Sequence, residues 1–242
     1  MLVLLPPSET KADGGDGPSL DLDALSYPTL TPVRRKLLDA LVELADDVPA
    51  SLAALKLSDR QVAEVERNRR LRASPTAPAL ARYTGVLYDA LDLAGLRRPQ
   101  RQRAETRLAV ASALFGVVRG TDPIPAYRLS GGSVLPSVGA LTGVWRPALE
   151  PVLGGLDELV VDLRSAPYAG LARIPGAVAV RVVDGERQVA ISHHNKAHKG
   201  RLARVLATTP REPADVRALV RTARRAGLTL VSTGERTLDL VV

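Results

Sequence analysis

The sequence of 242 residues contains no cysteine and no long apolar run. Without cysteine, disulfides, thiolate nucleophiles and cysteine-based zinc or iron–sulfur sites are excluded. No stretch of about 18 apolar residues is free of charge, and the chain does not open on a basic segment followed by an apolar one, so neither a membrane span nor a secretion signal is expected. We therefore expect a cytoplasmic protein with no membrane partner, and we expect no cofactor.

Aromatic residues are also scarce, since Phe, Trp and Tyr together number seven. Proteins that bind single strands stack bases on several aromatic rings, so single-stranded DNA or unpaired RNA is a poor fit. The formal net charge of +7 nevertheless points to a polyanionic partner. The basic residues are five lysines and 28 arginines, a skew that a GC-rich genome would also produce. Among nucleic acids, the composition favours contact with a duplex backbone.

Histidine is the remaining scarce residue type, with only His193, His194 and His198. The last two stand four residues apart, a spacing that can hold a metal ion from one helix face. No third ligand accompanies them in the sequence. We therefore expect no metal site.

The first third of the chain predicts a strand followed by two helices. Leu2 to Leu5 is an apolar run that two prolines end, which is typical of a short buried strand. Thr31 and Pro32 open an amphipathic helix that ends before Pro49. Ser58 and Gln61 form a capping box that begins a helix over 59–71. An early pair of helices is expected.

The rest of the chain alternates strand and helix patterns without a regular rhythm. Asp184-Gly185 lies between two β-branched runs and predicts a hairpin over 178–191. No proline-rich or charged linker separates two cores. The sequence therefore predicts one α+β domain over 1–242, with a mixed β-sheet and flanking helices. The other expected elements are a strand with a short helix in 83–93, helices over 99–110, 142–153, 195–207 and 213–226, strands over 114–118 and 158–163, and a hairpin of 228–232 with 237–242.

Basic residues cluster on three of the expected helices, where spacings of three and four residues place many of them on shared faces. Such ridges can follow a phosphate backbone, and the alternative is a solvated charged face. Duplex DNA is therefore the expected macromolecular partner of what we expect to be a monomer. The candidate contacts are Arg67, Arg69, Arg70, Lys199, Arg201, Arg204, Arg217 and Arg221.

A second candidate site lies where the apolar strand at 114–118 gives way to a loop rich in proline. Arg119, Asp122, Tyr127 and Arg128 stand close together there. Charges at a strand end are costly to leave unpaired, so these side chains could form a binding pocket. The alternative is an Arg–Asp pair that pins the loop.

Several motifs, taken in order, resemble those of the YaaA family of peroxide-stress proteins, and the resemblance runs along nearly the whole chain. The most specific one is a strand, turn and Tyr-Arg-Leu block. The motifs are Pro6-Pro7-Ser8-Glu9-x-Lys11, Tyr83-x-Gly85-x-x-Tyr88, Leu114-Phe115-Gly116-Val117-Val118-Arg119-x-x-Asp122-x-x-Pro125-x-Tyr127-Arg128-Leu129, Trp145, Leu163-x-Ser165-x-x-Tyr168 and Lys196-x-x-Lys199-Gly200.

The resemblance implies a compact mixed fold with a helix-hairpin-helix element, binding to duplex DNA, and protection against hydrogen peroxide linked to control of free iron. The helix pair over 31–71 is the counterpart of that element. Its turn, Leu55-Lys56-Leu57, lacks the glycine that such hairpins use. The chain also departs from the family pattern at Ser130, where glutamate is usual, at Lys199, where arginine is usual, and in the block that holds Ser165.

Two functional hypotheses remain open. The first is a DNA-binding stress protein whose basic helices contact the duplex backbone and which limits oxidative damage to DNA. The second is an enzyme that acts on a small anionic, nucleotide-like ligand. Its pocket would use Lys11, Arg119, Asp122, Tyr127, Arg128, Ser165, Tyr168, Lys196 and Lys199. Because strand ends and helix starts are where sheet folds place ligand groups, Lys11, Arg119, Asp122, Tyr127, Arg128 and Lys196 are expected to converge on one cleft.

Overall fold

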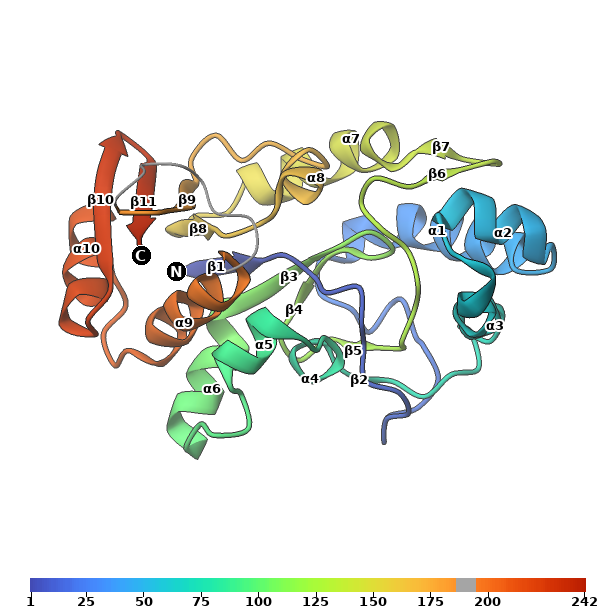
Figure 1. Ribbon diagram of the computed structural model, residues 1–242, viewed down its shortest axis with the longest axis horizontal. Helices are drawn as coiled ribbons and strands as arrows, with labels where there is room; N and C mark the ends of the chain where they lie inside the picture. Colours follow the sequence, from blue (N-terminus) through green and yellow to red (C-terminus); the bar gives the residue numbers. More distant parts are fainter. Residues whose placement is uncertain (186–194) are drawn as a thin grey trace.

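The computed structural model describes residues 1–185 and 195–242 and contains a mixed sheet of seven strands (Figure 1). Five strands in the middle run parallel, and one antiparallel strand closes each edge. The predicted single α+β domain with a mixed sheet is confirmed. In spatial order the strands are β10 (Thr229–Gly234), β11 (Thr237–Val241), β9 (Val178–Val183), β8 (Val160–Asp162), β1 (Leu2–Leu5), β3 (Leu108–Ser112) and β4 (Gly116–Arg119).

Strand β1 lies near the middle of the sheet. All four of its apolar residues are fully buried, and Pro6 and Pro7 end it because proline cannot donate to a strand ladder. It pairs in parallel with β3 on one side and with β8 on the other. Because the chain visits β3 before β8, the strand order reverses at β1. The carboxyl ends of parallel strands at such a switch point are where α/β sheets bind ligands.

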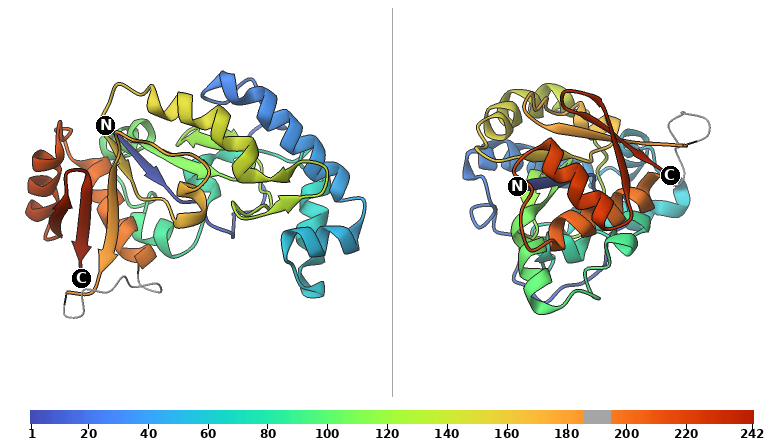
Figure 2. Two further views of the ribbon diagram at one scale, coloured as in Figure 1. Left: turned by 90° about the horizontal axis from the view of Figure 1, so that it is seen from above. Right: turned by 90° about the vertical axis from the view of Figure 1, so that its left-hand side faces the viewer.

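Helices cover both faces of this sheet (Figures 1 and 2). On one face α9 (Asn195–Thr208) packs on β1 and β9, with α5 (Val86–Leu91), α6 (Arg98–Arg107) and α10 (Val216–Arg225) beside it. Glycine at 200 lets α5 come close, because a Cβ there would lie 2.2 Å from the carbonyl oxygen of Leu87. On the other face lie α1 (Thr31–Leu44) and α7 (Leu141–Gly154), and Trp145 of α7 is fully buried.

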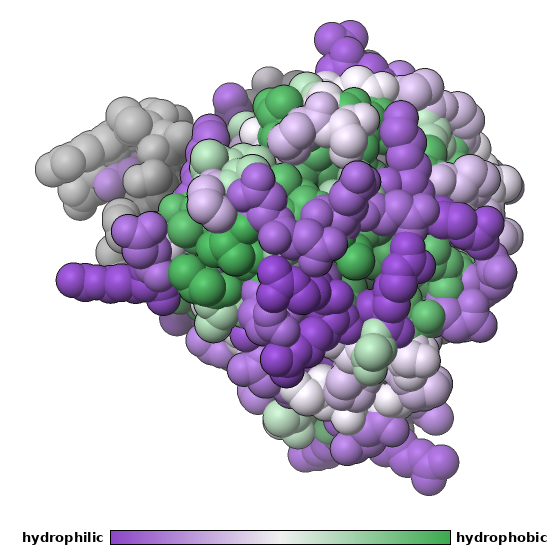
Figure 3. Space-filling view, turned by 90° about the vertical axis from the view of Figure 1, so that its right-hand side faces the viewer, coloured by the Kyte–Doolittle hydropathy of each residue, from purple (hydrophilic) through white to green (hydrophobic). Residues whose placement is uncertain are grey.

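The two early helices expected over 31–71 are α1 and α3 (Val62–Arg69), which a 3-10 turn, η2 (Asp59–Gln61), precedes. A further helix, α2 (Val48–Leu55), lies in the segment between them, and α2 and α3 form the end of the molecule away from α10 (Figure 1). Lys56, in the connection, has a φ of 54°, the left-handed conformation that glycine adopts most readily. Figure 3 faces this end, where hydrophilic side chains crowd the middle of the surface.

The structure differs from the sequence predictions at two places, and a third prediction lies partly outside the described residues. Segment 83–93 contains helix α5 and no strand; Tyr83 only forms an isolated bridge with Lys11. The helix expected over 99–110 ends at Arg107, because the buried apolar run that follows becomes β3. Of the hairpin expected over 178–191, only β9 lies within the described residues. The remaining short elements are η1 (Pro28–Leu30), β2 (Ala77–Pro78), α4 (Ala79–Arg82), β5 (Pro123–Ile124), β6 (Val134–Leu135), β7 (Gly139–Ala140) and α8 (Ala166–Ala169).

Within the described part of the chain, no helix has both the length and the apolar composition needed to cross a membrane.

Candidate functional site

A cluster of lysine and tyrosine side chains lies at the carboxyl ends of β1 and β3. Lys11, in the loop after β1, is only 8 % exposed. Its Nζ lies 4.2 Å from the ring centre of Tyr127 and 5.4 Å from that of Tyr83. The same nitrogen donates to the carbonyl oxygens of Ser8 at 3.1 Å and Glu9 at 3.2 Å. A buried amine thus rests against two aromatic rings, an arrangement that attracts cations.

A buried arginine fixes the loop that carries Lys11. The guanidinium of Arg82 donates to the carbonyl oxygens of Ala12 and Gly14 on the loop and to that of Ile124 on β5. Arg82 is itself fully buried. Hydrogen bonds from a charged donor to several carbonyls hold a backbone segment firmly. The position of Lys11 is therefore set by the segments that Arg82 ties together.

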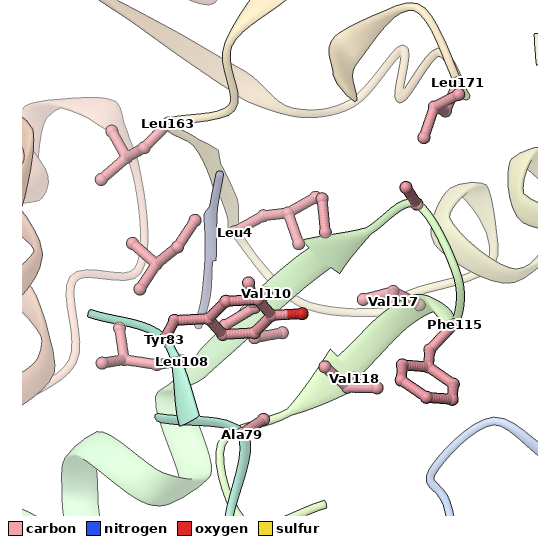
Figure 4. Packing of buried hydrophobic residues seen from close by; sticks show 14 of the residues in the cluster. Leu4, Ala79, Tyr83, Leu108, Val110, Phe115, Val117, Val118, Leu163 and Leu171 are labelled. Carbon is pink, nitrogen blue, oxygen red and sulfur yellow. The ribbon is translucent and has the colours of Figure 1, made fainter. Parts of the chain in front are cut away.

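Three hydroxyls form a chain beside Lys11. The Tyr127 hydroxyl lies 2.8 Å from Ser112 Oγ and 3.0 Å from the Tyr83 hydroxyl, while Ser112 Oγ also accepts the Phe115 amide at 2.9 Å. Figure 4 shows the ring of Tyr83 lying across β3 beside Val110. Since three hydroxyls share two hydrogen bonds, one of their three protons is left to donate elsewhere. We call Lys11, Tyr83, Ser112 and Tyr127 the lysine–tyrosine cluster.

Burial shifts the protonation of this cluster. It lowers the pKa of Lys11 to about 7, and repulsion from Arg128 acts in the same direction. Burial also raises the pKa of Tyr127 well above its ordinary value, so this phenol remains protonated at neutral pH. The cluster therefore combines an amine that is partly unprotonated at neutral pH with hydroxyls that keep their protons.

The rim of the cluster carries an ion pair and a third tyrosine. Arg128, whose side chain is 14 % exposed, donates to the Glu9 carboxylate at 2.8 Å, whereas the Glu9 side chain is 69 % exposed. Asn68 of α3 binds the backbone N–H and C=O of Arg128, both at 2.8 Å. The Tyr168 hydroxyl, from α8, accepts the Gly131 amide at 3.1 Å. The structure thus brings Lys11, Tyr127, Arg128 and Tyr168 into one region.

Arg119 and Asp122 lie elsewhere. Arg119 ends β4, which is antiparallel to β3, and it pairs with Ala109 near the amino end of that strand. Its guanidinium binds Glu158 at 3.3 Å, and Glu158 also binds the amino group of Met1 at 3.0 Å. Asp122 accepts hydrogen bonds from the Ser26 N–H and hydroxyl and from the Arg119 N–H. These two residues pin loops at the amino edge of β1 and β3, so the six expected residues do not share one cleft.

The other residues proposed for the pocket have different surroundings. Lys199 is buried on α9 and donates to the carbonyl oxygens of Leu163 at 2.9 Å and Arg164 at 3.2 Å, so it holds the loop after β8. Burial lowers the pKa of Lys199. Ser165 and Lys196 are exposed, and among the described contacts none joins either side chain to the lysine–tyrosine cluster.

The arginines expected to contact DNA fall into two groups. Those in and directly after α3 pair with carboxylates. Arg67 binds Asp13 at 2.6 Å and Glu64 at 2.5 Å, and the Glu66 carboxylate forms ion pairs with Arg69 and Arg70, both at 2.6 Å. Arg204 donates to the carbonyl of Leu91 at 2.7 Å and binds Asp92 at 3.0 Å. By contrast, Arg201, Arg217 and Arg221 are exposed on α9 and α10.

A hollow of about 360 Å³ lies between α6 and the two helices, α9 and α10, that carry these exposed arginines. Arg103 and Arg225 line it together with three threonines, and no acidic side chain is among the described residues that do so. Arg221 and Arg217 lie one and two helical turns before Arg225 on α10. Segments 97–107 and 201–225 together hold twelve arginines and three acidic residues. We call this surface the arginine face.

A metal site finds no support in the described residues. Over 1–185 and 195–242, no three His, Cys, Asp or Glu side chains gather closely enough to hold an ion. His193 and His194 lie outside the described residues, and His198 lies on α9.

Sequence reasoning left three residues of the site out of the proposed pocket, and one of them, Tyr83, belongs to a motif. Ser112 is a hydroxyl at the carboxyl end of a fully buried strand, and that polar interruption of an apolar run was the available signal. Glu9 belongs to the first motif, but its pairing with Arg128, 119 positions later, depends on the fold. Such a contact has no signature in the spacing of one sequence.

Comparison with known proteins agrees with this arrangement of motifs. A family model described as "Peroxide stress protein YaaA" matches residues 1–230. A UPF0246 protein of Corynebacterium efficiens is 48 % identical over the full length of both chains. A UPF0246 protein of Streptomyces coelicolor is 46 % identical over 94 % of this chain and 90 % of its own. The chain therefore belongs to the YaaA family of peroxide stress proteins.

Proposed function

We propose that this peroxide stress protein binds duplex DNA through the arginine face, as a cytoplasmic monomer, and thereby limits oxidative damage to the DNA. The observation that carries the proposal is the concentration of arginine on α6, α9 and α10, around a hollow whose described lining has no carboxylate. The arginines of α3 are matched by acids, so they offer a duplex much less net charge.

Arginine side chains on helices bind phosphate oxygens without reading bases. Three successive turns of α10 present Arg217, Arg221 and Arg225 to solvent, while Leu219 and Ala223 anchor the opposite face of the helix. Each neutralised phosphate releases counterions, and this release drives binding at moderate salt. Binding should therefore be strong at low salt and nearly independent of DNA sequence.

The test is a triple variant, Arg217→Gln, Arg221→Gln and Arg225→Gln, in a fluorescence-anisotropy titration with a duplex. We expect the dissociation constant to rise at least about tenfold, because three phosphate contacts are lost. The matched control is Arg67→Gln, Arg69→Gln and Arg70→Gln, which removes the same charge from α3. Equal losses in both variants would show that only net charge matters, and a loss confined to α3 would place the interface on the helix pair.

A second candidate function has its own observation. Lys11, Tyr127, Arg128 and Tyr168 gather at the switch point of the sheet, where ligands bind in related architectures. We propose that this region is the active site of an enzyme that acts on a small anionic ligand. Thermal-shift measurements of wild type and Arg128→Gln with nucleoside monophosphates test this proposal. Stabilisation of wild type alone supports an anion site, and no shift with any of them contradicts it.

A further inference from the structure

We propose that Lys11 is a nucleophilic amine that forms an imine with the carbonyl carbon of a ligand carrying a phosphate or carboxylate. This inference rests on the second function, the enzyme site, and is independent of DNA binding at the arginine face. It names the substrate class, an aldehyde or ketone with an anionic group nearby.

The surroundings of Lys11 suit a nucleophile better than a structural cation. Of the five lysines in the chain, Lys11 and Lys199 are buried. Lys199 donates to two carbonyls of the segment after β8, so it holds another part of the chain. Among the described residues, Lys11 donates to Ser8 and Glu9, three and two residues before it, and its amine faces tyrosine rings. No described ion pair joins Lys11 to a carboxylate, and Glu64 and Glu9 act on it only through longer-range attraction that burial outweighs. Burial therefore favours the free amine that attacks carbonyl groups.

Arg128 supplies the anion site. Its guanidinium is largely buried, and its acidic partner Glu9 belongs to the same loop as Lys11. The Glu9 side chain is mostly exposed, so exchanging its carboxylate for a ligand's phosphate or carboxylate costs little. Arg128 and Lys11 both bind Glu9, Arg128 through the carboxylate and Lys11 through the carbonyl. A ligand anion in place of the Glu9 carboxylate would therefore lie near the Lys11 amine.

The hydroxyl chain supplies the proton that the reaction needs. The free amine of Lys11 attacks the carbonyl carbon, the C–N bond forms as the C=O π bond breaks, and one proton of the amine passes to the oxygen to give a carbinolamine. The hydroxyl chain then protonates the carbinolamine oxygen, which leaves as water when the C–O bond breaks. The protonated imine remains and solvent returns a proton to the chain, so the step is balanced without an oxidant or a reductant. The proton left over in the chain of Ser112, Tyr127 and Tyr83 is placed to assist the departing oxygen.

The experiment compares two aldehydes that differ by one phosphate, pyridoxal and pyridoxal 5′-phosphate, on the full chain in DNA-free buffer at pH 7. Sodium cyanoborohydride reduces the imine, and peptide mass spectrometry identifies the labelled lysine. We expect Lys11 to be labelled at least about tenfold faster than exposed Lys36, because a far larger fraction of its amine is unprotonated. Labelling confined to exposed lysines would overturn the proposal.

Variants at the rim test the anion site without touching the amine. Arg128→Gln should slow labelling by pyridoxal 5′-phosphate more than labelling by pyridoxal, because the variant loses the contact with the phosphate as well as the repulsion that lowers the pKa of Lys11. Glu9→Gln should speed labelling by pyridoxal 5′-phosphate. An Arg128→Gln variant that reacts with both aldehydes as wild type does would contradict the role of Arg128. Tyr127→Phe should slow imine formation with both aldehydes, since it breaks the hydroxyl chain.

A further arm identifies the source of the carbonyl. A duplex with one abasic site offers an aldehyde flanked by phosphates, so the same reductant would crosslink it to Lys11. Crosslinking would assign the site to damaged DNA, and labelling by the small aldehyde alone would assign it to a free metabolite. Because the triple variant of α10 retains Lys11, its labelling by pyridoxal 5′-phosphate should be normal even where its DNA binding is lost.

Discussion

The environment of Lys11 makes its charge unfavourable in the folded state. The pKa of Lys11 falls from an ordinary 10.5 to about 7, with burial as the largest cause. A folded pKa below the unfolded one means that the unfolded chain binds the proton more readily. The penalty on folding is therefore complete below about pH 7 and fades as the pH rises toward 10.5.

Replacing Lys11 by Met should accordingly change how stability depends on pH. Between pH 7 and pH 9 the free energy of unfolding of wild type should rise by on the order of 2 kcal/mol relative to the variant. Urea unfolding of both proteins at the two pH values measures this difference. Lys36→Met, at an exposed lysine of α1, is the control and should show no such change. Parallel pH profiles for wild type and Lys11→Met would mean that Lys11 stays charged when folded.

At the scale of elements, the contact of α5 with α9 depends on one glycine. Any side chain at 200 would run into the backbone of α5, at the carbonyl of Leu87. The neighbouring Lys199 holds the loop after β8 through two carbonyls. The Lys199-Gly200 motif is therefore structural on both counts, since it positions α9 against α5 and against the sheet.

Gly200→Ala should lower the free energy of unfolding by roughly 2 to 4 kcal/mol, because a backbone clash of this kind needs a helix to shift. Thermal or urea unfolding measures it. Gly143→Ala in α7 is a matched control, since a Cβ there meets nothing within 4 Å. That variant should be neutral or up to about 1 kcal/mol more stable, as alanine favours helices. If Gly200→Ala were equally harmless, α9 would pack more loosely than the structure indicates.

Elements with a strong local signal were predictable from the sequence. The apolar run and prolines of β1, the proline in the first turn of α1 and the capping box at Ser58 gave the right element types, because each signal acts within a few residues. The strand β3 was missed because Leu108 to Val110 continue a helical pattern, and only burial in the middle of the sheet selects the extended form. Tertiary contacts therefore determined the secondary structure of these residues.

At the scale of the whole molecule, charge is distributed unevenly. The arginine-rich segments 97–107 and 201–225 hold twelve arginines and three acidic residues, so their net charge is greater than the +7 of the entire chain. The rest of the chain therefore carries more acidic than basic residues. Acids compensate the arginines at α3, whereas α6, α9 and α10 hold an excess of arginine in which only Arg101, Arg107 and Arg204 pair with acids among the described ion pairs. A polyanion should therefore approach the molecule from that side.

Duplex binding should weaken steeply with salt. The logarithm of the association constant should fall linearly with the logarithm of salt concentration, with a slope of about −0.9 for each phosphate that an arginine contacts. The triple variant of α10 should have a slope shallower by about 2 to 3 units. Anisotropy titrations from low to moderate salt measure both slopes. An unchanged slope in the variant would remove α10 from the interface, whatever the loss in affinity.

Topology also decided how much of the candidate site was predictable. Lys11, Tyr127 and Arg128 were correctly placed near one another because each lies in a motif at a strand end or in the loop that follows. Arg119 is only eight residues before Tyr127, yet it lies at the opposite edge of β3 because β4 runs antiparallel. Which edge of a sheet a strand end reaches depends on strand direction, and one sequence does not state that direction.

The central position of β1 has a consequence for biosynthesis. This strand leaves the ribosome well before its two neighbours, β3 and β8, which begin at residues 108 and 160. Its apolar side chains and ladder groups therefore remain without their partners while more than a hundred further residues are made. Contacts so distant in sequence close slowly, and unpaired apolar strands attract one another between nascent chains. Yield should depend on chaperones that shield the first residues until the second half of the sheet emerges.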